Sequence, residues 1–180
     1  MAVIRAASVF LGSRPSLLTS HDEAARAMGR VLGERRIALV YGGGDEGLMG
    51  AAAQAALDAG GEVHGVIPGA LDVDELGHPA LTSLEVVSSM HERKARMAER
   101  SDVAIMLPGG FGTLDEFFEA LTWTQLGIQA TPCGILEVDG FFAPLLAFLD
   151  QAASSGLLDP AHRGLIIVED DPARLLDALG

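Results

Sequence analysis

Short apolar runs alternate along this chain with longer stretches of helical periodicity. The apolar runs have the length of buried strands and lie at 3–11, 37–41, 62–67, 84–87, 103–107, 133–138 and 165–168. Helices are predicted over 20–35, 47–59, 90–100, 114–126, 141–154 and 172–179, with Thr19 or Ser20 capping the first; residues 70–82 are expected to be irregular. Strands that alternate with helices form parallel sheets covered on both faces. The pattern therefore predicts an α/β fold with a Rossmann-like, doubly wound, mainly parallel sheet.

Three of the predicted strands end in turns rich in glycine or serine. These turns are Leu11-Gly12-Ser13, Tyr41-Gly42-Gly43-Gly44 and Leu107-Pro108-Gly109-Gly110. Ligands of doubly wound sheets bind beyond the carboxyl ends of the strands, so we expect a pocket at these turns. Gly12, Ser13, Gly43 and Gly44 are candidates for its lining. The same glycines would also permit tight turns and close helix–sheet packing, and the sequence leaves both interpretations open.

The stretch from 103 to 126 carries the strongest chemical signal. A buried strand runs into Pro108-Gly109-Gly110-Phe111-Gly112-Thr113, and a helix is predicted to follow. Glycines let the backbone approach a ligand, and the start of a helix presents free N–H groups, so the stretch predicts an anion site. Glu116 lies one turn into the predicted helix, where repulsion from Glu119 could raise its pKa. Thr113 and Glu116 also have the spacing of a capping box, so a capping role and a catalytic role both fit.

Two adjacent cations, Arg93 and Lys94, precede this stretch on a predicted helix. They flank an apolar stripe formed by Met90 and Met97, whereas the acidic residues of that helix, Glu92 and Glu99, fall on the opposite side. Long basic side chains in such positions often cover the core with their aliphatic stems while their charges reach water. Adjacent cations before a phosphate-type loop would also suit an anionic ligand.

Composition narrows the class of protein. A chain of 180 residues with 49% hydrophobic residues suits one domain, residues 1–180. A net charge of -13 disfavours nucleic acid and anionic membranes as partners. We see no signal peptide and no apolar run of the ~20 residues that span a bilayer, and the single cysteine, Cys133, is expected to be a buried, inert thiol. These features favour the cytoplasm.

Cofactor and metal motifs are weak. The run Gly42-Gly43-Gly44-Asp45-Glu46-Gly47 resembles a dinucleotide fingerprint, but the next strand ends in Pro68-Gly69 instead of an acidic residue that would hold a ribose hydroxyl. The five histidines are scattered without metal-ligand spacing. We therefore expect neither a nicotinamide cofactor nor a metal.

Taken in order, these motifs resemble the Lonely Guy family, the cytokinin-activating phosphoribohydrolases, some of which carry the label lysine decarboxylase. The matching segments are Tyr41-Gly42-Gly43-Gly44 with Gly47-Leu48-Met49-Gly50, Met90-His91-Glu92-Arg93-Lys94, Pro108 to Glu116, and Thr122-Trp123-Thr124-Gln125-Leu126-Gly127. The likeness as a whole covers nearly the entire chain, from Phe10 to the terminal helix at Asp171-Pro172. The resemblance implies a homodimer, with its site near the interface, that needs no cofactor. It also implies hydrolysis of the N-glycosidic bond of purine or cytokinin nucleoside 5′-monophosphates to free base and ribose 5-phosphate.

The resemblance also implies which residues form the site. Arg93 and Glu116 correspond to the catalytic pair. The residues that correspond to substrate or phosphate contacts, or that shape their turn, are Glu75, Lys94, Gly109, Gly110, Phe111, Gly112, Thr113, Leu114, Asp115 and Thr122.

Several positions depart from the family pattern. Leu11 and Arg14 replace a cysteine and a serine, and Thr131 replaces a lysine. Asp45 and Glu46 add acids that could border the pocket, which leaves the preferred base open.

Two other functions are alternatives to hydrolysis. Lysine decarboxylation fits poorly because pyridoxal phosphate needs a lysine and Lys94 is the only lysine of the sequence. The main alternative is a non-catalytic carrier of a nucleotide or molybdenum cofactor, which need not retain the pair Arg93 and Glu116.

Overall fold

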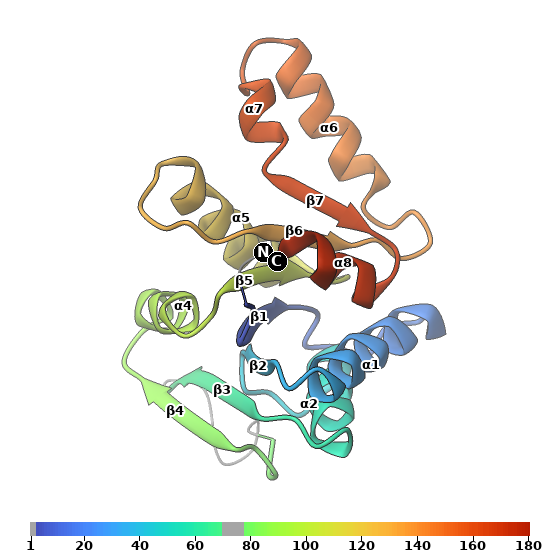
Figure 1. Ribbon diagram of the computed structural model, residues 1–180, viewed down its shortest axis with the longest axis vertical. Coiled ribbons are helices and arrows are strands. Elements are labelled where there is room, and N and C mark those ends of the chain that lie inside the picture. Colours follow the sequence, from blue (N-terminus) through green and yellow to red (C-terminus); the bar gives the residue numbers. More distant parts are fainter. Residues whose placement is uncertain (1–2, 70–77) are drawn as a thin grey trace.

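The computed structural model, described for residues 3–69 and 78–180, contains a sheet of seven parallel strands (Figure 1). The strands are β1 Ala6–Phe10, β2 Ala38–Tyr41, β3 Val63–Pro68, β4 Ser83–Val87, β5 Val103–Met106, β6 Cys133–Leu136 and β7 Ile166–Glu169. Their order across the sheet is β4-β3-β2-β1-β5-β6-β7. The predicted α/β, Rossmann-like fold is confirmed, and each predicted strand forms within a few residues of its expected position.

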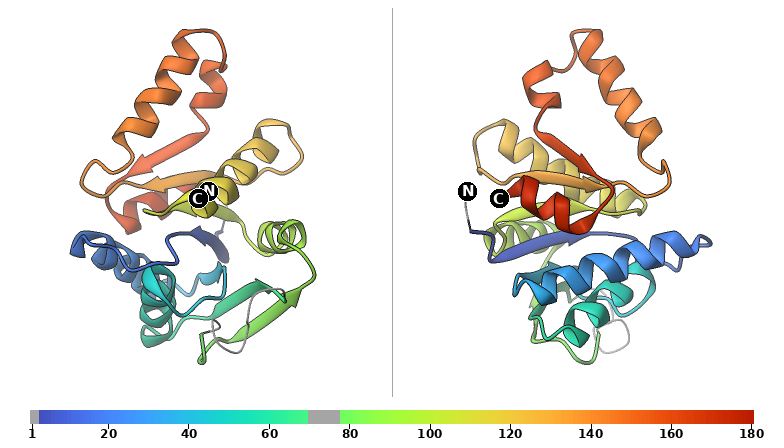
Figure 2. Two further views of the ribbon diagram at one scale, coloured as in Figure 1. Left: turned by 180° about the vertical axis from the view of Figure 1, so that it is seen from behind. Right: turned by 45° about the vertical axis from the view of Figure 1, so that its right-hand side comes forward.

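Helices cover both faces of this sheet. The helices are α1 Thr19–Glu34, α2 Gly47–Asp58, α4 Met90–Glu99, α5 Phe111–Gln125, α6 Ala143–Ser154, α7 Pro160–Arg163 and α8 Pro172–Leu179. Figure 2 shows α1, α2 and α8 on one face and α4 and α5 on the other, while α6 and α7 extend away from the rest. The short helix α7 escaped the sequence prediction. It begins at Pro160 after Asp159, whose side chain accepts a hydrogen bond from the N–H of Ala161.

The period-two alternation of the strands divides the core into two layers. In β1, Ala7 and Val9 pack with α1, α2 and α8, whereas Phe10 packs with α4 and α5. Cys133 is buried in the second layer, and burial raises the pKa of its thiol to about 11, as expected of an inert cysteine. The sequences of the strands are continuously apolar because both faces of the sheet are covered.

The crossing of the chain at β1 fixes where a ligand can bind. The chain adds β2, β3 and β4 on one side of β1 and then returns to add β5, β6 and β7 on the other. The loops that leave β1 and β5 meet at the carboxyl edge, where the N–H of Gly12 donates to the carbonyl of Pro108 at 3.0 Å. In open α/β sheets this reversal of strand order forms the ligand crevice.

Two predicted helix caps are wrong. Helix α5 begins at Phe111 with Gly110 as its N-cap, so Thr113 already lies inside the helix and neither it nor Glu116 caps it. The turn after β5 closes early because Thr113 packs onto Gly109, where a Cβ atom would lie 2.1 Å from Oγ1 of Thr113. Helix α1 begins at Thr19 after an extended Leu18 without a side-chain cap.

Candidate active site

A cavity of about 960 Å³ opens at the carboxyl ends of β1, β2 and β5. Its volume suits a small-molecule ligand, since such pockets span roughly 300–1,000 Å³. Ten of the predicted site residues line it: Gly12, Ser13, Gly44, Arg93, Gly109, Gly110, Phe111, Gly112, Thr113 and Glu116. Tertiary folding thus brings together the three turns that the sequence singled out.

Arg93 of α4 and Glu116 of α5 form an ion pair inside this cavity. Nη2 of Arg93 lies 3.2 Å from Oε1 of Glu116, and each side chain is only 10% exposed. The guanidinium occupies space beside the second glycine turn, because a Cβ atom at Gly42 would lie 2.0 Å from Nη2 of Arg93. The absence of a side chain at Gly42 therefore leaves room for the Arg93 guanidinium. This contact links the second glycine turn to the basic motif.

The side chains of α4 are buried and exposed in a pattern that differs in part from the one predicted from the sequence. Glu92 and Glu99 are exposed as predicted. Met97 is buried, but Met90 is 43% exposed and lines the cavity, so the two methionines do not form one buried stripe. Arg93 is itself buried instead of extending its charge to water.

Burial raises the pKa of the Glu116 carboxyl above its usual value. Desolvation is the largest cause, and the anions Asp115 and Glu119 add to it, whereas Arg93 and Lys94 act in the opposite direction. The expected direction of the shift is therefore confirmed, but repulsion from Glu119 is a lesser cause than burial. A carboxyl group with a raised pKa in a cavity, paired with a cation, is typical of a functional site.

The first turn of α5, beside this pair, has the features of an anion site. The N–H groups at the start of a helix have no acceptor within the helix, and the helix dipole favours negative charge there. A Cβ atom added at Gly110 or Gly112 would meet nothing within 4 Å, so the cavity side of this turn is open. Thr113 is buried at the base of the turn, and Phe111 is 93% exposed at its rim.

Other predicted substrate contacts lie outside the cavity of this chain. Nζ of Lys94 lies 3.1 Å from both Asp115 Oδ2 and Glu119 Oε2. Thr122 is exposed and donates to the carbonyl of Phe118 at 2.6 Å, and Leu114 packs against the core layer of α4 and α5. Gly43, with φ at 83°, faces Gly65 and Leu84 of the sheet. Glu75 lies outside the described residues, so its contact stays a prediction, as do those of Lys94, Leu114, Asp115 and Thr122.

Sequence reasoning missed one wall of the cavity. It is lined by Ser16 before α1, His21 in the first turn of α1 and Phe141 from the loop after β6. Nδ1 of His21 lies 2.9 Å from Oγ of Ser16, and the His21 ring contacts Phe141 edge to face. Isolated residues so far apart carry no local motif. Only the neighbouring positions of β1, β5 and β6 in the sheet could have suggested this wall.

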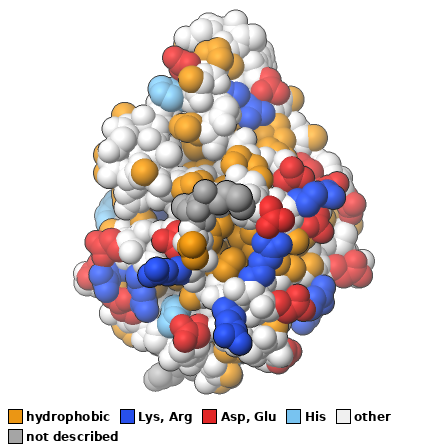
Figure 3. Space-filling model, viewed as in Figure 1, with side chains coloured by type: hydrophobic (Ala, Val, Ile, Leu, Met, Phe, Trp, Pro, Cys, Tyr) orange, Lys and Arg blue, Asp and Glu red, His pale blue; other side chains and the backbone are white. Residues whose placement is uncertain are grey.

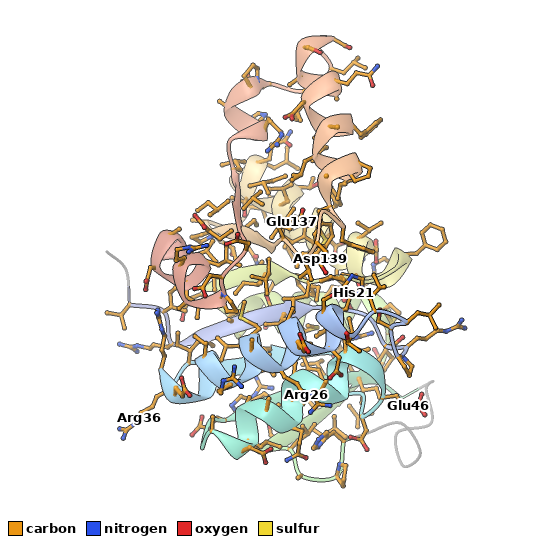
Figure 4. The ribbon with its side chains drawn as sticks, turned by 90° about the vertical axis from the view of Figure 1, so that its right-hand side faces the viewer. His21, Arg26, Arg36, Glu46, Glu137 and Asp139 are labelled. Atoms are coloured by element: carbon orange, nitrogen blue, oxygen red, sulfur yellow. The ribbon has the colours of Figure 1, made fainter. Side chains whose placement is uncertain are left out.

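Acidic residues also border the cavity. Asp45 and Glu46 line it, as the sequence had suggested, and Oδ1 of Asp45 lies 3.5 Å from Nε2 of the buried His78. Figure 4 shows His21 in the first turn of α1 and Glu46 just before α2. No group of three or more potential metal-ligating side chains occurs within 3–69 and 78–180.

Comparison with known proteins places the chain in a family. Residues 49–179 match the family model described as "possible lysine decarboxylase". The chain is 46% identical over 168 residues to the cytokinin riboside 5′-monophosphate phosphoribohydrolase of Rhodococcoides fascians, a match that covers 93% of this chain and 85% of the relative. It is 44% identical over 171 residues to the enzyme of that name from Arabidopsis thaliana, covering 95% and 79% of the two chains. This chain belongs to the Lonely Guy family.

Solved structures place this Lonely Guy chain in the same fold as a carrier protein. The molybdenum cofactor carrier protein of Chlamydomonas reinhardtii superposes with a TM-score of 0.73 and 22% identity, over 96% of this chain and 94% of the carrier. At that identity the likeness concerns the fold alone.

The decarboxylase description of the family model does not fit the site. Lys94 is the single lysine of this Lonely Guy protein. It does not line the large cavity but is held between two carboxylates, which raise the pKa of its ammonium group against the effect of burial. A lysine that forms a Schiff base must instead reach the substrate and lose its proton.

Proposed function

We propose that this protein hydrolyses the N-glycosidic bond of purine or cytokinin nucleoside 5′-monophosphates, releasing free base and ribose 5-phosphate. The main support for this proposal is that the buried pair Arg93 and Glu116 lines the same cavity as the open first turn of α5. The names of relatives at about 45% identity support the same reaction.

The first turn of α5 would hold the 5′-phosphate. Its N–H groups and the helix dipole offer the positive field that an otherwise acidic protein lacks. With the phosphate there, the ribose would lie one helical turn away, beside Glu116. The proposal therefore assigns Gly110, Gly112 and Thr113 to phosphate binding and Gly109 to the shape of the turn.

Glu116 would act at the anomeric carbon. Cleavage of a glycosidic bond passes through a state with positive charge on the sugar, which a carboxylate stabilises while it orients water. The oxygen of water bonds to C1′ as the C1′–N bond breaks, and a proton from that water ends on the released base. Arg93 would hold Glu116 and the phosphate or ribose, since a guanidinium with a pKa above about 12 is a poor proton donor.

Chromatography of the reaction products tests this function. Purified protein is incubated with AMP and with isopentenyladenosine monophosphate, and free base is measured. We expect release of base by the native protein and a loss of at least about 100-fold in kcat for Glu116→Gln, the scale at which one group acting on the transition state contributes. Near-normal hydrolysis by folded Glu116→Gln would disprove the role of Glu116, whereas tight nucleotide binding without product would favour the carrier function.

We also propose a homodimer, supported by the apolar surface of the arm formed by α6 and α7. Helix α6 is rich in apolar residues, yet none of its residues is buried. Phe148 is 64% exposed and Leu157 86% exposed. Figure 1 shows this arm standing away from the sheet, where a second copy could cover it. Exposed apolar patches of this kind commonly mark association surfaces.

Free nucleotides in the cytoplasm are the proposed substrates, in preference to nucleic acid or a membrane surface. The net charge of -13 supports this choice. On the face shown in Figure 3, basic side chains lie among acidic ones. Arg96 and Arg100, for example, both pair with Glu85. None of the described helices is long and apolar enough to cross a membrane.

A further inference from the structure

A second, much smaller cavity lies against Glu116, between α4, α5 and the sheet. We call it the rear chamber; its lining is Ser8, Phe10, Lys94, Ala98, Ala104, Glu116, Glu119, Ala120, Trp123, Gln129 and Thr131. Among the described residues, Glu116 alone lines both the rear chamber and the large cavity. The catalytic candidate therefore forms the wall between the two.

The size and chemistry of the rear chamber match one water molecule. Its volume is about 10 Å³, close to the minimum of roughly 10–15 Å³ that holds a single water. A buried water needs two to four polar partners. The charged side chains of the lining are Lys94 from α4 and Glu116 and Glu119 from α5, and Gln129 from the loop after α5 adds an amide. Ser8, Trp123 and Thr131 also line the chamber.

Hydrogen-bond accounting gives this water three partners. The side-chain oxygen Oε1 of Gln129 is buried and makes no hydrogen bond within the described part of the chain. Lys94 has three N–H donors, and Asp115 and Glu119 account for two of them. A water that donates to Gln129 and to the Glu116 carboxylate, and accepts from Lys94, would satisfy all three groups. Buried polar atoms are rarely left without a partner, which makes this arrangement favourable.

We propose that Lys94 and Gln129 hold one buried water against Glu116, that Glu119 fixes Lys94 in place, and that all three are positioning residues for the Glu116 carboxylate. This positioning role rests on the hydrolase function proposed above. Lys94 is the central residue of this group. Its side chain is 11% exposed and pairs, at the wall of the chamber, with Glu119, whose side chain is 26% exposed. The proposal gives the adjacent cations distinct tasks: Arg93 meets Glu116 from the large cavity, and Lys94 meets it through the chamber.

The charges around Glu116 make this arrangement testable by titration. The charged groups that act on its carboxyl are Arg93 and Lys94 from α4 and Asp115 and Glu119 from α5; the cations lower its pKa and the anions raise it. Removing Lys94 should therefore raise the pKa of Glu116, and neutralising Glu119 should lower it. These opposite signs follow from the charges of Lys94 and Glu119, and the water itself is tested separately.

A crystal structure at high resolution tests the water itself. We expect density for one water within hydrogen-bond distance of Gln129 Oε1 and Glu116, and its loss in Gln129→Met, which fills the space without a polar atom. Gln54→Met on the surface of α2, where the Gln54 side chain donates a hydrogen bond to Asp58, is the matched control and should keep the water. An empty or collapsed chamber in the native protein would overturn the proposal.

The second test is ¹³C NMR titration of Glu116 without nucleotide. We expect upward shifts of the Glu116 midpoint by about one pH unit for Lys94→Met and by a smaller amount for Gln129→Met, and a downward shift for Glu119→Gln. Arg96→Met, which breaks surface pairs with Glu85 and Glu99, is the control and should leave the midpoint unchanged. Shifts of one sign in Lys94→Met and Glu119→Gln, or no shift in either, would overturn the proposal.

These measurements separate the two hypotheses. Neither the density nor the titration requires turnover. If both behave as expected but the native protein releases no base from any nucleoside monophosphate, the hydrolase function fails and the chamber stands. If hydrolysis is normal and the midpoint responds to none of the chamber variants, only the chamber fails.

Discussion

At the scale of single residues, the buried acid Glu116 is the point where stability and chemistry conflict. Its pKa is raised, chiefly because burial disfavours the ionised form. A carboxyl whose pKa is higher in the folded than in the unfolded state stabilises the fold fully only at low pH, and this contribution is lost as pH rises through the folded pKa. At neutral pH the Glu116 carboxyl therefore contributes less to stability than it does at low pH.

Replacing Glu116 by glutamine should reveal this conflict. We expect Glu116→Gln to unfold at a higher temperature than the native protein at pH 7, and the difference to shrink toward pH 4, near the unfolded pKa. Thermal unfolding monitored by circular dichroism across this range provides the measurement. Arg26→Gln, on the exposed face of α1, is a control for generic surface charge removal. A Glu116→Gln variant that is less stable at pH 7 would mean that the ion pair with Arg93 outweighs burial.

At the scale of elements, the first turn of α5 leaves its backbone open at a cost in helix stability. Gly110 is the N-cap without a side-chain hydrogen bond, and Gly112 occupies the first turn with open space beside it. Glycine inside a helix costs roughly 1 kcal/mol relative to alanine. The element therefore gives up helix stability to leave its N–H groups open toward the cavity.

The substitution Gly112→Asp should stabilise the helix and weaken nucleotide binding. We expect Gly112→Asp to stabilise the protein by about 0.5–1 kcal/mol, through better helix propensity and the dipole, but to raise KM for AMP roughly tenfold by repelling the phosphate. Gly112→Asn is the control for size, and should raise KM much less. Urea unfolding and steady-state kinetics measure the two effects. Equal KM values for the two variants would argue that the phosphate binds elsewhere.

At the scale of the whole molecule, the compact two-layer core contrasts with the arm formed by α6 and α7. The contact of α1 with α2 is close enough that a Cβ atom at Gly29 would lie 2.1 Å from the carbonyl oxygen of Ala52. Helix α6, by contrast, has no buried residue in the single chain. Its Leu145, Leu146 and Leu149 pack only partly against the core, so a surface that covers the exposed face of α6 would add stability.

A charge on the arm should therefore weaken association. We expect the native protein to be a dimer by light scattering at micromolar concentration, and Phe148→Glu to shift it toward monomer by at least tenfold in Kd. Leu17→Glu, at a fully exposed loop position, is the control and should not change the molar mass. A native protein that is monomeric under these conditions would contradict the dimer.

Local pattern was sufficient for the fold and for the two halves of the site taken separately. Strand and helix positions follow from the alternation of apolar runs and helical periodicity, because residues near in sequence decide them. The anion turn at 108–113 and the basic pair at 93–94 were also visible, since glycine and charge carry local signals. The cap at Thr113 was predicted wrongly because its side chain packs on Gly109, a contact that spacing alone does not reveal.

Only the tertiary structure decided how these pieces meet. The sequence by itself determined a parallel α/β sheet with glycine turns at its carboxyl edge and a carboxylate beside one of them. The fold then placed Arg93 against Gly42 and Glu116, Lys94 behind Glu116 instead of in the large cavity, and His21 beside Phe141. The reason is physical: strand order sets which loops become neighbours, and burial of charge depends on contacts between residues far apart in the chain.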